Sequence, residues 1–305
     1  MMKRRYGAAL PIAILLAAIA VVWWPRRPEP PPLVIGGDLP APCRNVAFEA
    51  VTYVVCETDL RADSIGVFHA GADGKPFGSL EAFDKAVAGE GRPVLLAVNG
   101  GMYHEDLSPV GLLVENGSEK SPLNLADGEG NFFLKPNGVF LVGNDGKAAV
   151  MESNAYAVTK RDVAFATQSG PMLVIDGKIH PRFEPNGTSR YIRNGVGVRD
   201  ENTVLLAISR SEVSFGSFAR LFRDALQCRN ALFLDGAVSA LSDGKRMMSA
   251  DNTRRARSSQ CRRSRSRQCR RSSRRNSRPV WLQSGTLVCN ASACSTPPIL
   301  PFSAS

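Results

Sequence analysis

The sequence has no CxxC pair and no Cys/His spacing of the kind that holds zinc, which excludes a zinc finger or a related structural metal site. Its first 27 residues contain no acidic side chain, and residues 246–305 contain one acidic residue beside thirteen arginines. The net charge of +10 therefore belongs to the two ends, since residues 28–245 carry 20 basic and 27 acidic groups. Because the body is acidic, we expect it to bind no nucleic acid.

Long apolar runs are scarce as well, and the longest lies at residues 7–24. Three basic residues precede it, and a Pro-rich stretch to residue 32 follows it. Eighteen residues are at the lower limit for a membrane-spanning helix, and Trp23 and Trp24 suit a membrane interface. We favour an uncleaved signal anchor, with a signal peptide cleaved after the A-x-A pattern at 18–20 as the alternative. Both predict a periplasmic protein anchored in the inner membrane, or a secreted one.

Export makes the few cysteines informative. Cys43 and Cys56 open the globular region, and an oxidising compartment allows them to form a disulfide that closes a short hairpin-like segment. The alternative is a pair of buried thiols that merely pack. Cys228 follows a helical pattern, and we expect it to be buried and unpaired.

Between residues 44 and 245, short apolar runs alternate with Gly, Asn, Asp and Pro, as is typical of a sheet-rich domain. Helical spacing occurs in two places, near 80–88 after a Ser79 N-cap and near 217–227. The predicted fold class is α+β, with a multi-stranded mixed or antiparallel sheet core and a few flanking helices. The predicted strands are 51–57, 64–69, 94–99, 110–115, 131–135, 139–142, 172–175, 195–198, 204–208 and 231–234.

Three Gly-bearing segments carry the candidate chemistry. The first, at 97–103, ends an apolar strand in Asn99-Gly100-Gly101, where backbone amides can approach an anionic or sugar ligand closely. The second, at 169–172, leads into a strand. The third, at 231–236, places Asp235 at the carboxyl end of a strand, which favours a site over a surface turn. By local chemistry alone, we favour a plain strand-ending turn for the first segment.

In their order along the chain, these segments resemble the phosphodiester glycosidase family, in particular its bacterial exported branch, which is similar to the uncovering enzyme. The similarity covers about residues 43–245. We therefore divide the chain into a targeting segment with a linker (1–32), a glycosidase-like domain (43–245) and a tail (246–305). The motifs that carry the resemblance are VNGGMY, PVGLLVENG, PLNLADGEGNFFLKPNGVF, SGPMLVIDGKIHP, IRNGVGV and LFRDALQCRNALFLDG.

The resemblance implies hydrolysis of a sugar 1-phosphodiester, with release of the sugar from phosphate. Asn99, Gly100 and Gly101 match the family's NGG segment and would line the sugar or phosphate. Arg193 matches the arginine of its R-x-x-x-G segment and would pair with phosphate oxygens. Asp235 and Gly236 match its LDGG segment, as catalytic and substrate-binding residues. This chain departs there, because Ala237 replaces the second glycine.

Glycosidic cleavage ordinarily uses two carboxyl groups, and Asp235 is the first candidate. The acidic residues Glu105, Asp106 and Glu212 compete for the second role, and His104 is a further acid or base candidate. No cofactor is required by this chemistry, although a divalent metal held by oxygens of Asp235 and Asn99 stays an open alternative. The partner is a sugar phosphodiester or an envelope glycan, with the membrane contacted through residues 7–24. The rival hypothesis is an envelope module that binds such a ligand without turnover.

The stretch 246–305 differs in character from the rest. Its Arg/Ser-rich part, 246–278, has hardly any aliphatic side chains, so we predict a disordered tail. A solvated tail, a basic arm for nucleic acid or anionic lipid, and an out-of-frame reading of GC-rich sequence are the alternatives, and we favour the last. The family's domain continues here into an apolar strand. Without it the protein would be unstable or inactive, unless residues 279–289 dock as a substitute.

Overall fold

The computed structural model describes residues 39, 41–89, 96–159, 162–235, 240–242, 247–249 and 286–291. All of them belong to one unit of the chain, Pro32–Ser305, and only this unit is described below. The predicted anchor at 7–24, Gly236 and most of the stretch 246–305 lie outside the described residues. Within the described ranges, no helix is both long and apolar enough to cross a membrane.

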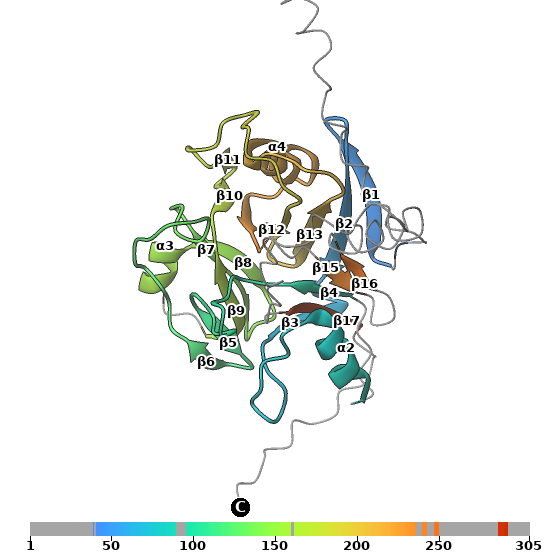
Figure 1. The fold of residues 1–305 in the computed structure, drawn as a ribbon, viewed down its shortest axis with the longest axis vertical. Helices are drawn as coiled ribbons and strands as arrows, with labels where there is room; N and C mark the ends of the chain where they lie inside the picture. The colour runs from blue at the N-terminus through green and yellow to red at the C-terminus, as the bar shows by residue number, and fades with distance from the viewer. Residues whose placement is uncertain are drawn as a thin grey trace, which may run out of the picture. The chain divides into compact units, whose positions relative to one another are not determined.

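A seven-stranded sheet forms the largest part of the described fold (Figure 1). Every strand pairing in it is antiparallel. Alternate residues of a strand point to opposite sides of the sheet. The central strands have apolar residues at both sets of positions, so both faces of the sheet are apolar there. In spatial order the strands are β1 (Cys43–Phe48), β2 (Val51–Asp59), β13 (Thr203–Ser209), β12 (Asn194–Asp200), β14 (Asn230–Phe233), β10 (Met172–Ile175) and β11 (Lys178–Ile179).

A second, five-stranded sheet brings together segments from both ends of the described chain (Figure 1). Strand β17 pairs antiparallel with β3 on one side and with β4 on the other, so that it lies inside the sheet. In spatial order the strands are β16 (Met247–Ser249), β15 (Ala240–Ser242), β4 (Leu96–Asn99), β17 (Thr286–Ala291) and β3 (Asp63–Phe68).

A third sheet, also five-stranded and antiparallel, is built from the middle of the chain. Its inner strand β9 runs directly into β10 through Gly170-Pro171, so this short segment connects the third sheet to the first. In spatial order the strands are β6 (Ser118–Ser121), β5 (Leu113–Glu115), β9 (Val163–Ser169), β7 (Gly138–Gly143) and β8 (Ala148–Glu152).

The described helices are short and cover outer faces of the sheets. Helix α2 (Leu80–Gly89) starts after Ser79, whose Oγ accepts a hydrogen bond from the Ala82 amide at 3.1 Å, as predicted. Helix α3 (Ser153–Val158) follows β8. Helix α4 (Phe215–Arg220) continues into a π-helical turn, η1 (Leu221–Ala225), so the second predicted helix begins two residues early and changes its period midway.

One apolar core joins all three sheets. Val54 and Leu206 from the first sheet, Val67 and Val98 from the second, and Phe140 from the third are all buried in the same cluster. The opposite face of the first sheet packs against α4 and η1 through a second cluster that includes Tyr53 and Phe218. Both clusters follow from strand alternation, since Tyr53 and Val54 are adjacent in β2 and point to opposite faces.

The predicted fold class is confirmed, since antiparallel sheets dominate and the helices are few. The strand predicted at 131–135 is wrong. The Leu134 amide instead donates to the Asn131 carbonyl at 3.2 Å, and the Asn137 side chain donates to the Phe132 carbonyl at 3.0 Å. Pro136 has no amide hydrogen to offer a neighbouring strand, so this segment forms turns that its own side chains complete.

The domain boundary drawn at residue 245 differs from the structure. Strands β16 and β17 both lie after it, and both are part of the second sheet. Residues 286–289, the end of the segment that we named as a substitute strand, lie within β17. The sheet therefore contains a strand between β3 and β4 that is supplied from near the carboxyl end of the chain.

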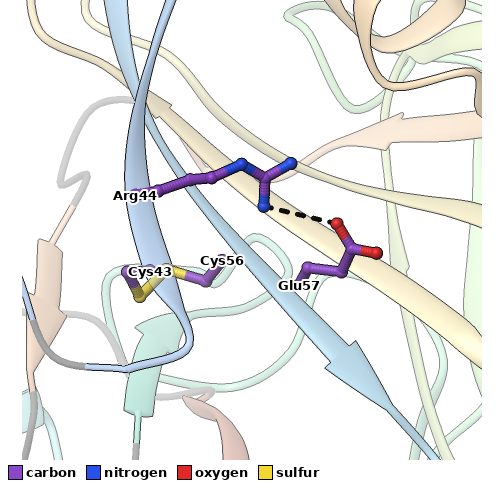
Figure 2. Close-up of a disulfide and its surroundings, with 4 residues drawn as sticks. All are labelled: Cys43, Arg44, Cys56 and Glu57. Carbon is purple, nitrogen blue, oxygen red and sulfur yellow. Dashed lines mark hydrogen bonds and ion pairs between the residues drawn. A yellow bond between two sulfur atoms is a disulfide. The ribbon is translucent and has the colours of Figure 1, made fainter.

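The predicted disulfide between Cys43 and Cys56 is present, and Figure 2 shows it linking β1 to β2. The two residues are directly opposite each other in the antiparallel pair, so the bond closes the open end of the hairpin. Arg44 and Glu57, the next residues, form an ion pair across the same strands at 3.3 Å (Figure 2). Cys228 is a buried free thiol, as predicted, and burial raises its pKa to about 12.

Candidate functional site

Three strands bring the predicted site segments together. Asn99 ends β4, Asn194 begins β12, and Asp235 follows β14 by two residues. The Asn99 Nδ2 donates to the Asp235 carbonyl at 2.6 Å, and the Asp235 amide donates to the Gly100 carbonyl at 3.3 Å. Two motifs that are 136 residues apart in the sequence are therefore connected by two hydrogen bonds.

Asn194 connects the third motif to the same point. Its Nδ2 donates to the Asn99 Oδ1 at 3.0 Å, and its backbone carbonyl accepts from the Leu234 amide at 3.1 Å. The side chains of Asn194 and Asn99 are both buried. The arrangement fixes Asn99 from two sides, because its amide group donates to Asp235 and accepts from Asn194.

The second Gly-bearing segment also reaches this region. The Pro171 carbonyl accepts from the Phe233 amide at 3.0 Å, which places the end of β9 beside the end of β14. Gly101 lies against β9 so closely that a Cβ atom there would be 2.5 Å from the Gln168 carbonyl oxygen and from the Thr167 Oγ1. Any larger residue would push the Asn99–Gly101 segment away from β9, so glycine is required by packing at this position.

Arg193 is a buried cation beside these segments, and 1% of the residue is exposed to solvent. Its Nε donates to the Val213 carbonyl at 2.9 Å, and its Nη2 donates to the Ser189 carbonyl at 3.0 Å. No carboxylate of the described residues forms an ion pair with it. Burial lowers the pKa of its guanidinium to about 10, because the charged form loses hydration there.

Aromatic rings supply much of the surroundings of this cation. The Arg193 guanidinium carbon lies 3.5 Å from the centre of the Phe215 ring and 5.5 Å from that of Phe233. Phe183 stacks on Phe215, and His180 stacks on Phe183. Ring faces attract a cation but do not neutralise it, so the positive charge of Arg193 persists beside the turn that carries Asp235.

The other predicted catalytic candidates lie on exposed segments of the described chain. His104, Glu105 and Asp106 are exposed in the loop after Gly101, and Glu212 is exposed before α4. Asp106 accepts hydrogen bonds from the amide and hydroxyl of Ser108, which lower its pKa and mark it as a turn-forming residue. Gly236 is outside the described residues. Among the residues that are described, no group of three or more His, Cys, Asp or Glu side chains could hold a metal.

Sequence reasoning missed two residues of interest near the same segments. Asn194 lay inside the IRNGVGV motif, but only the long-range pairing of β12 with β14 reveals its contact with Asn99. Glu115 in β5 is partly buried, and its pKa is raised by burial, with Lys120 and the His69 amide opposing the shift. Burial raises the pKa of Tyr103, and the charge of Glu115 adds to this shift. The Tyr103 ring stacks on His69, with 5.3 Å between the ring centres. No local sequence signal distinguishes Glu115 from an ordinary surface glutamate.

Comparison with known proteins places these motifs in a family. The family model described as phosphodiester glycosidase matches residues 93–261. An uncharacterised protein of Escherichia coli (strain K12), YigE, is 39% identical over 179 residues, which are 59% of this chain and 69% of YigE.

Among solved structures, the chain is similar to the catalytic domain of zebrafish N-acetylglucosamine-1-phosphodiester alpha-N-acetylglucosaminidase, auto-inhibited by its pro-peptide. The two align with a TM-score of 0.53 and 16% identity, over 81% of each chain, so this likeness concerns the fold. The family match covers more than half of the sequence and includes the segments of Asn99, Arg193 and Asp235. The chain therefore belongs to the phosphodiester glycosidase family.

Proposed function

We propose that this protein is a hydrolase that cleaves the glycosidic bond of a sugar 1-phosphodiester. Membership of the phosphodiester glycosidase family supports the reaction class. The observation that carries the proposal is Arg193, a buried guanidinium without a carboxylate partner among the described residues, beside the Asp235 turn. A buried cation is unfavourable unless an anion compensates it, and a phosphodiester is an anion that a guanidinium recognises well.

In the proposed reaction, water adds to the anomeric carbon while the bond from that carbon to the phosphate oxygen breaks. Asp235 takes a proton from the water, and the phosphomonoester leaves with the electron pair of the broken bond. Arg193 stabilises the charge that develops on the leaving phosphate. Because a phosphomonoester has a second pKa of about 6, it leaves without a strong general acid. This removes the need for a second carboxyl group close to Asp235.

We also propose that the reaction takes place in the cell envelope, on a sugar phosphodiester or an envelope glycan. The Cys43–Cys56 disulfide supports export, because such bonds persist in oxidising compartments. The apolar run at 7–24 supports attachment to the inner membrane, with a secreted form as the alternative.

The test uses the purified full chain and a panel of sugar 1-phosphodiesters, with simple glycosides of the same sugars for comparison. Free sugar and phosphomonoester should appear in equal amounts from the phosphodiesters only. Reaction in ¹⁸O-labelled water should leave the phosphate unlabelled, because the carbon–oxygen bond is the one that breaks. Label in the phosphate would contradict the proposed bond cleavage.

Two variants assign the roles. Asp235→Asn should lower kcat by about 10²-fold or more, as expected for loss of a general base. Arg193→Lys should weaken use of the phosphodiester, since an ammonium cannot reproduce the planar fork. Asp176→Asn, at an exposed turn, is the control and should leave turnover unchanged. Saturable binding by the wild type without any turnover would instead identify a binding module.

A further inference from the structure

Asn194 occupies an unusual position among the buried polar residues described. It is 1% exposed, and its Nδ2 is used to hold Asn99, with the Asn99 Oδ1 at 3.0 Å and the Asn99 carbonyl at 3.4 Å. Asn99 in turn donates to the Asp235 carbonyl at 2.6 Å. A chain of side-chain amides thus runs from β12 through β4 to the turn of the proposed catalytic residue.

The other end of the Asn194 amide, its buried Oδ1, is without a hydrogen-bond partner among the residues that the structure describes. The orientation of the amide is fixed, since the reverse one would place two oxygens, of Asn194 and Asn99, against each other. A buried acceptor without a donor is unfavourable and uncommon in folded proteins, so this oxygen is suited to a donor that arrives with a ligand.

The residue that carries this oxygen is joined to the segments of the proposed site, because its Nδ2 donates to the Asn99 Oδ1 and its backbone carbonyl accepts from the Leu234 amide. Arg193 precedes Asn194 directly, and adjacent residues of an extended chain point to opposite sides. A ligand that reaches both residues therefore lies across the beginning of β12, with its phosphate toward Arg193. The Oδ1 is an acceptor only, so it selects a hydrogen-bond donor and disfavours a second anionic group. On a sugar phosphodiester, that donor is a hydroxyl group of the sugar.

We propose that Asn194 determines specificity for the sugar: its Oδ1 accepts a hydrogen bond from one sugar hydroxyl, while its Nδ2 positions Asn99. This proposal rests on the proposed function, because it assigns the sugar half of the same substrate. Asn194 thereby couples recognition of the sugar to the placement of the Asp235 turn. A substrate that lacks this hydroxyl leaves a buried acceptor unsatisfied in the complex and is discriminated against.

The experiment measures kcat/KM of the full chain for the best sugar 1-phosphodiester and for analogues in which one hydroxyl at a time is replaced by hydrogen. For the wild type, one analogue should lose about tenfold, the effect of one neutral hydrogen bond. Asn194→Leu removes the acceptor and should abolish the preference for that hydroxyl. Asn194→Asp keeps an acceptor oxygen but loses the donor to Asn99, so it should lower kcat while the preference remains.

The control is Asn230→Leu, at the end of β14 that is farther along the chain from Asp235. Asn230 also uses a side-chain amide oxygen, which accepts from the Asp176 amide at 2.8 Å, so its loss tests general destabilisation. This variant should keep the hydroxyl preference of the wild type. Thermal unfolding of each variant verifies that it is folded, and Asn194→Asp supplies the second measurement if Asn194→Leu does not fold.

The possible outcomes separate the two proposals. An unchanged preference in folded Asn194→Leu, or loss of the preference in folded Asn194→Asp with its acceptor retained, overturns the role of Asn194 and leaves the hydrolase function intact. If the wild type binds the panel without turnover, calorimetric affinities replace kcat/KM, and the same preference supports Asn194 in a binding module. Absence of both binding and turnover overturns both proposals.

Discussion

At the scale of single residues, the main feature of this protein is that charge and hydrogen-bonding capacity are buried near the strand ends of the candidate site. Arg193 is buried under aromatic rings, and Asn194 is buried with an acceptor that has no partner among the described residues. Each arrangement lowers the stability of the ligand-free domain, and each is relieved by a ligand of matching chemistry. A binding site that stabilises its ligand in this way trades some folding stability for affinity.

Glu115 gives a prediction at the same scale, because burial raises the pKa of its carboxyl. Below the unfolded-state pKa the group is neutral in both states and has no effect. As the pH rises through the folded-state pKa, ionisation of the partly buried group destabilises the fold. Glu115→Gln should therefore be more stable than the wild type at neutral pH, and this advantage should vanish in mild acid.

Urea midpoints of the wild type and of Glu115→Gln at pH values from 4 to 8 would check the prediction. Glu119→Gln, at an exposed neighbour on β6, is the control for removal of a carboxylate from this part of the sheet. If the gain in stability of Glu115→Gln is the same at every pH, folding does not raise the pKa of the Glu115 carboxyl, and the prediction is wrong.

At the scale of elements, the β1–β2 hairpin shows how tertiary contacts support an unfavourable local turn. Glu49 and Ala50, at its turn, have φ values of 47° and 60°, which non-glycine residues rarely adopt. Glu49 is held there by Arg220 of α4, whose Nε lies 2.6 Å from Oε1, and by the Ser217 hydroxyl. A contact 171 residues away thus supports the turn, and the disulfide closes the other end of the hairpin.

The disulfide carries the prediction for this element. Replacing both Cys43 and Cys56 with serine should lower the free energy of unfolding by about 3 kcal/mol, the expected effect of opening a loop of this length. Equilibrium denaturation of the double variant beside the oxidised wild type measures the difference. The reduced wild type should resemble the double variant. Equal stability of all three forms would mean that the unfolded chain is not restricted by this bond.

At the scale of the whole molecule, the second sheet depends on a strand that comes from near the carboxyl end. Strand β17 pairs with β3 over six residues and with β4 over four, and β4 carries Asn99 at its end. The expectation that an interior strand is missing does not describe this sheet, because Thr286–Ala291 lies between β3 and β4. The support for the candidate site therefore includes a segment that follows the Arg/Ser-rich stretch.

Truncation tests this dependence. A chain that ends at residue 285 leaves the main-chain groups of β3 and β4 without their partner, and it should lose cooperative unfolding or precipitate, given a typical reserve of about 5–15 kcal/mol. A chain that ends at residue 291 keeps β17 and is the matched control. It should unfold at the midpoint of the full chain. Equal midpoints for all three chains would show that β17 contributes nothing to the sheet.

Much of the local structure could be predicted from the sequence, because it depends on neighbours along the chain. The apolar run at 172–175 is strand β10 with the same bounds, and Ser79 caps helix α2. The strand predicted at 131–135 is wrong. Its apolar residues follow a pattern that is typical of a strand, but Pro136 and the Asn137 side chain direct its backbone into turns. The π-helical turn after α4 was not foreseen, since its hydrogen bond from Leu226 to Leu221 has no marker in the residue pattern.

By itself, the sequence determined the family and the sheet-rich fold class, since motif order and alternation are properties of the chain alone. It also predicted the Cys43–Cys56 bond, which the structure contains. Only the tertiary structure decided that Asn194 holds Asn99, that Glu115 is partly buried, and that residues 286–291 complete a sheet. Contacts between distant segments depend on how all the apolar faces pack together, and no local sequence pattern encodes that packing. The chemistry of the candidate site belongs to this second group, because its residues meet only at the ends of strands from two different sheets.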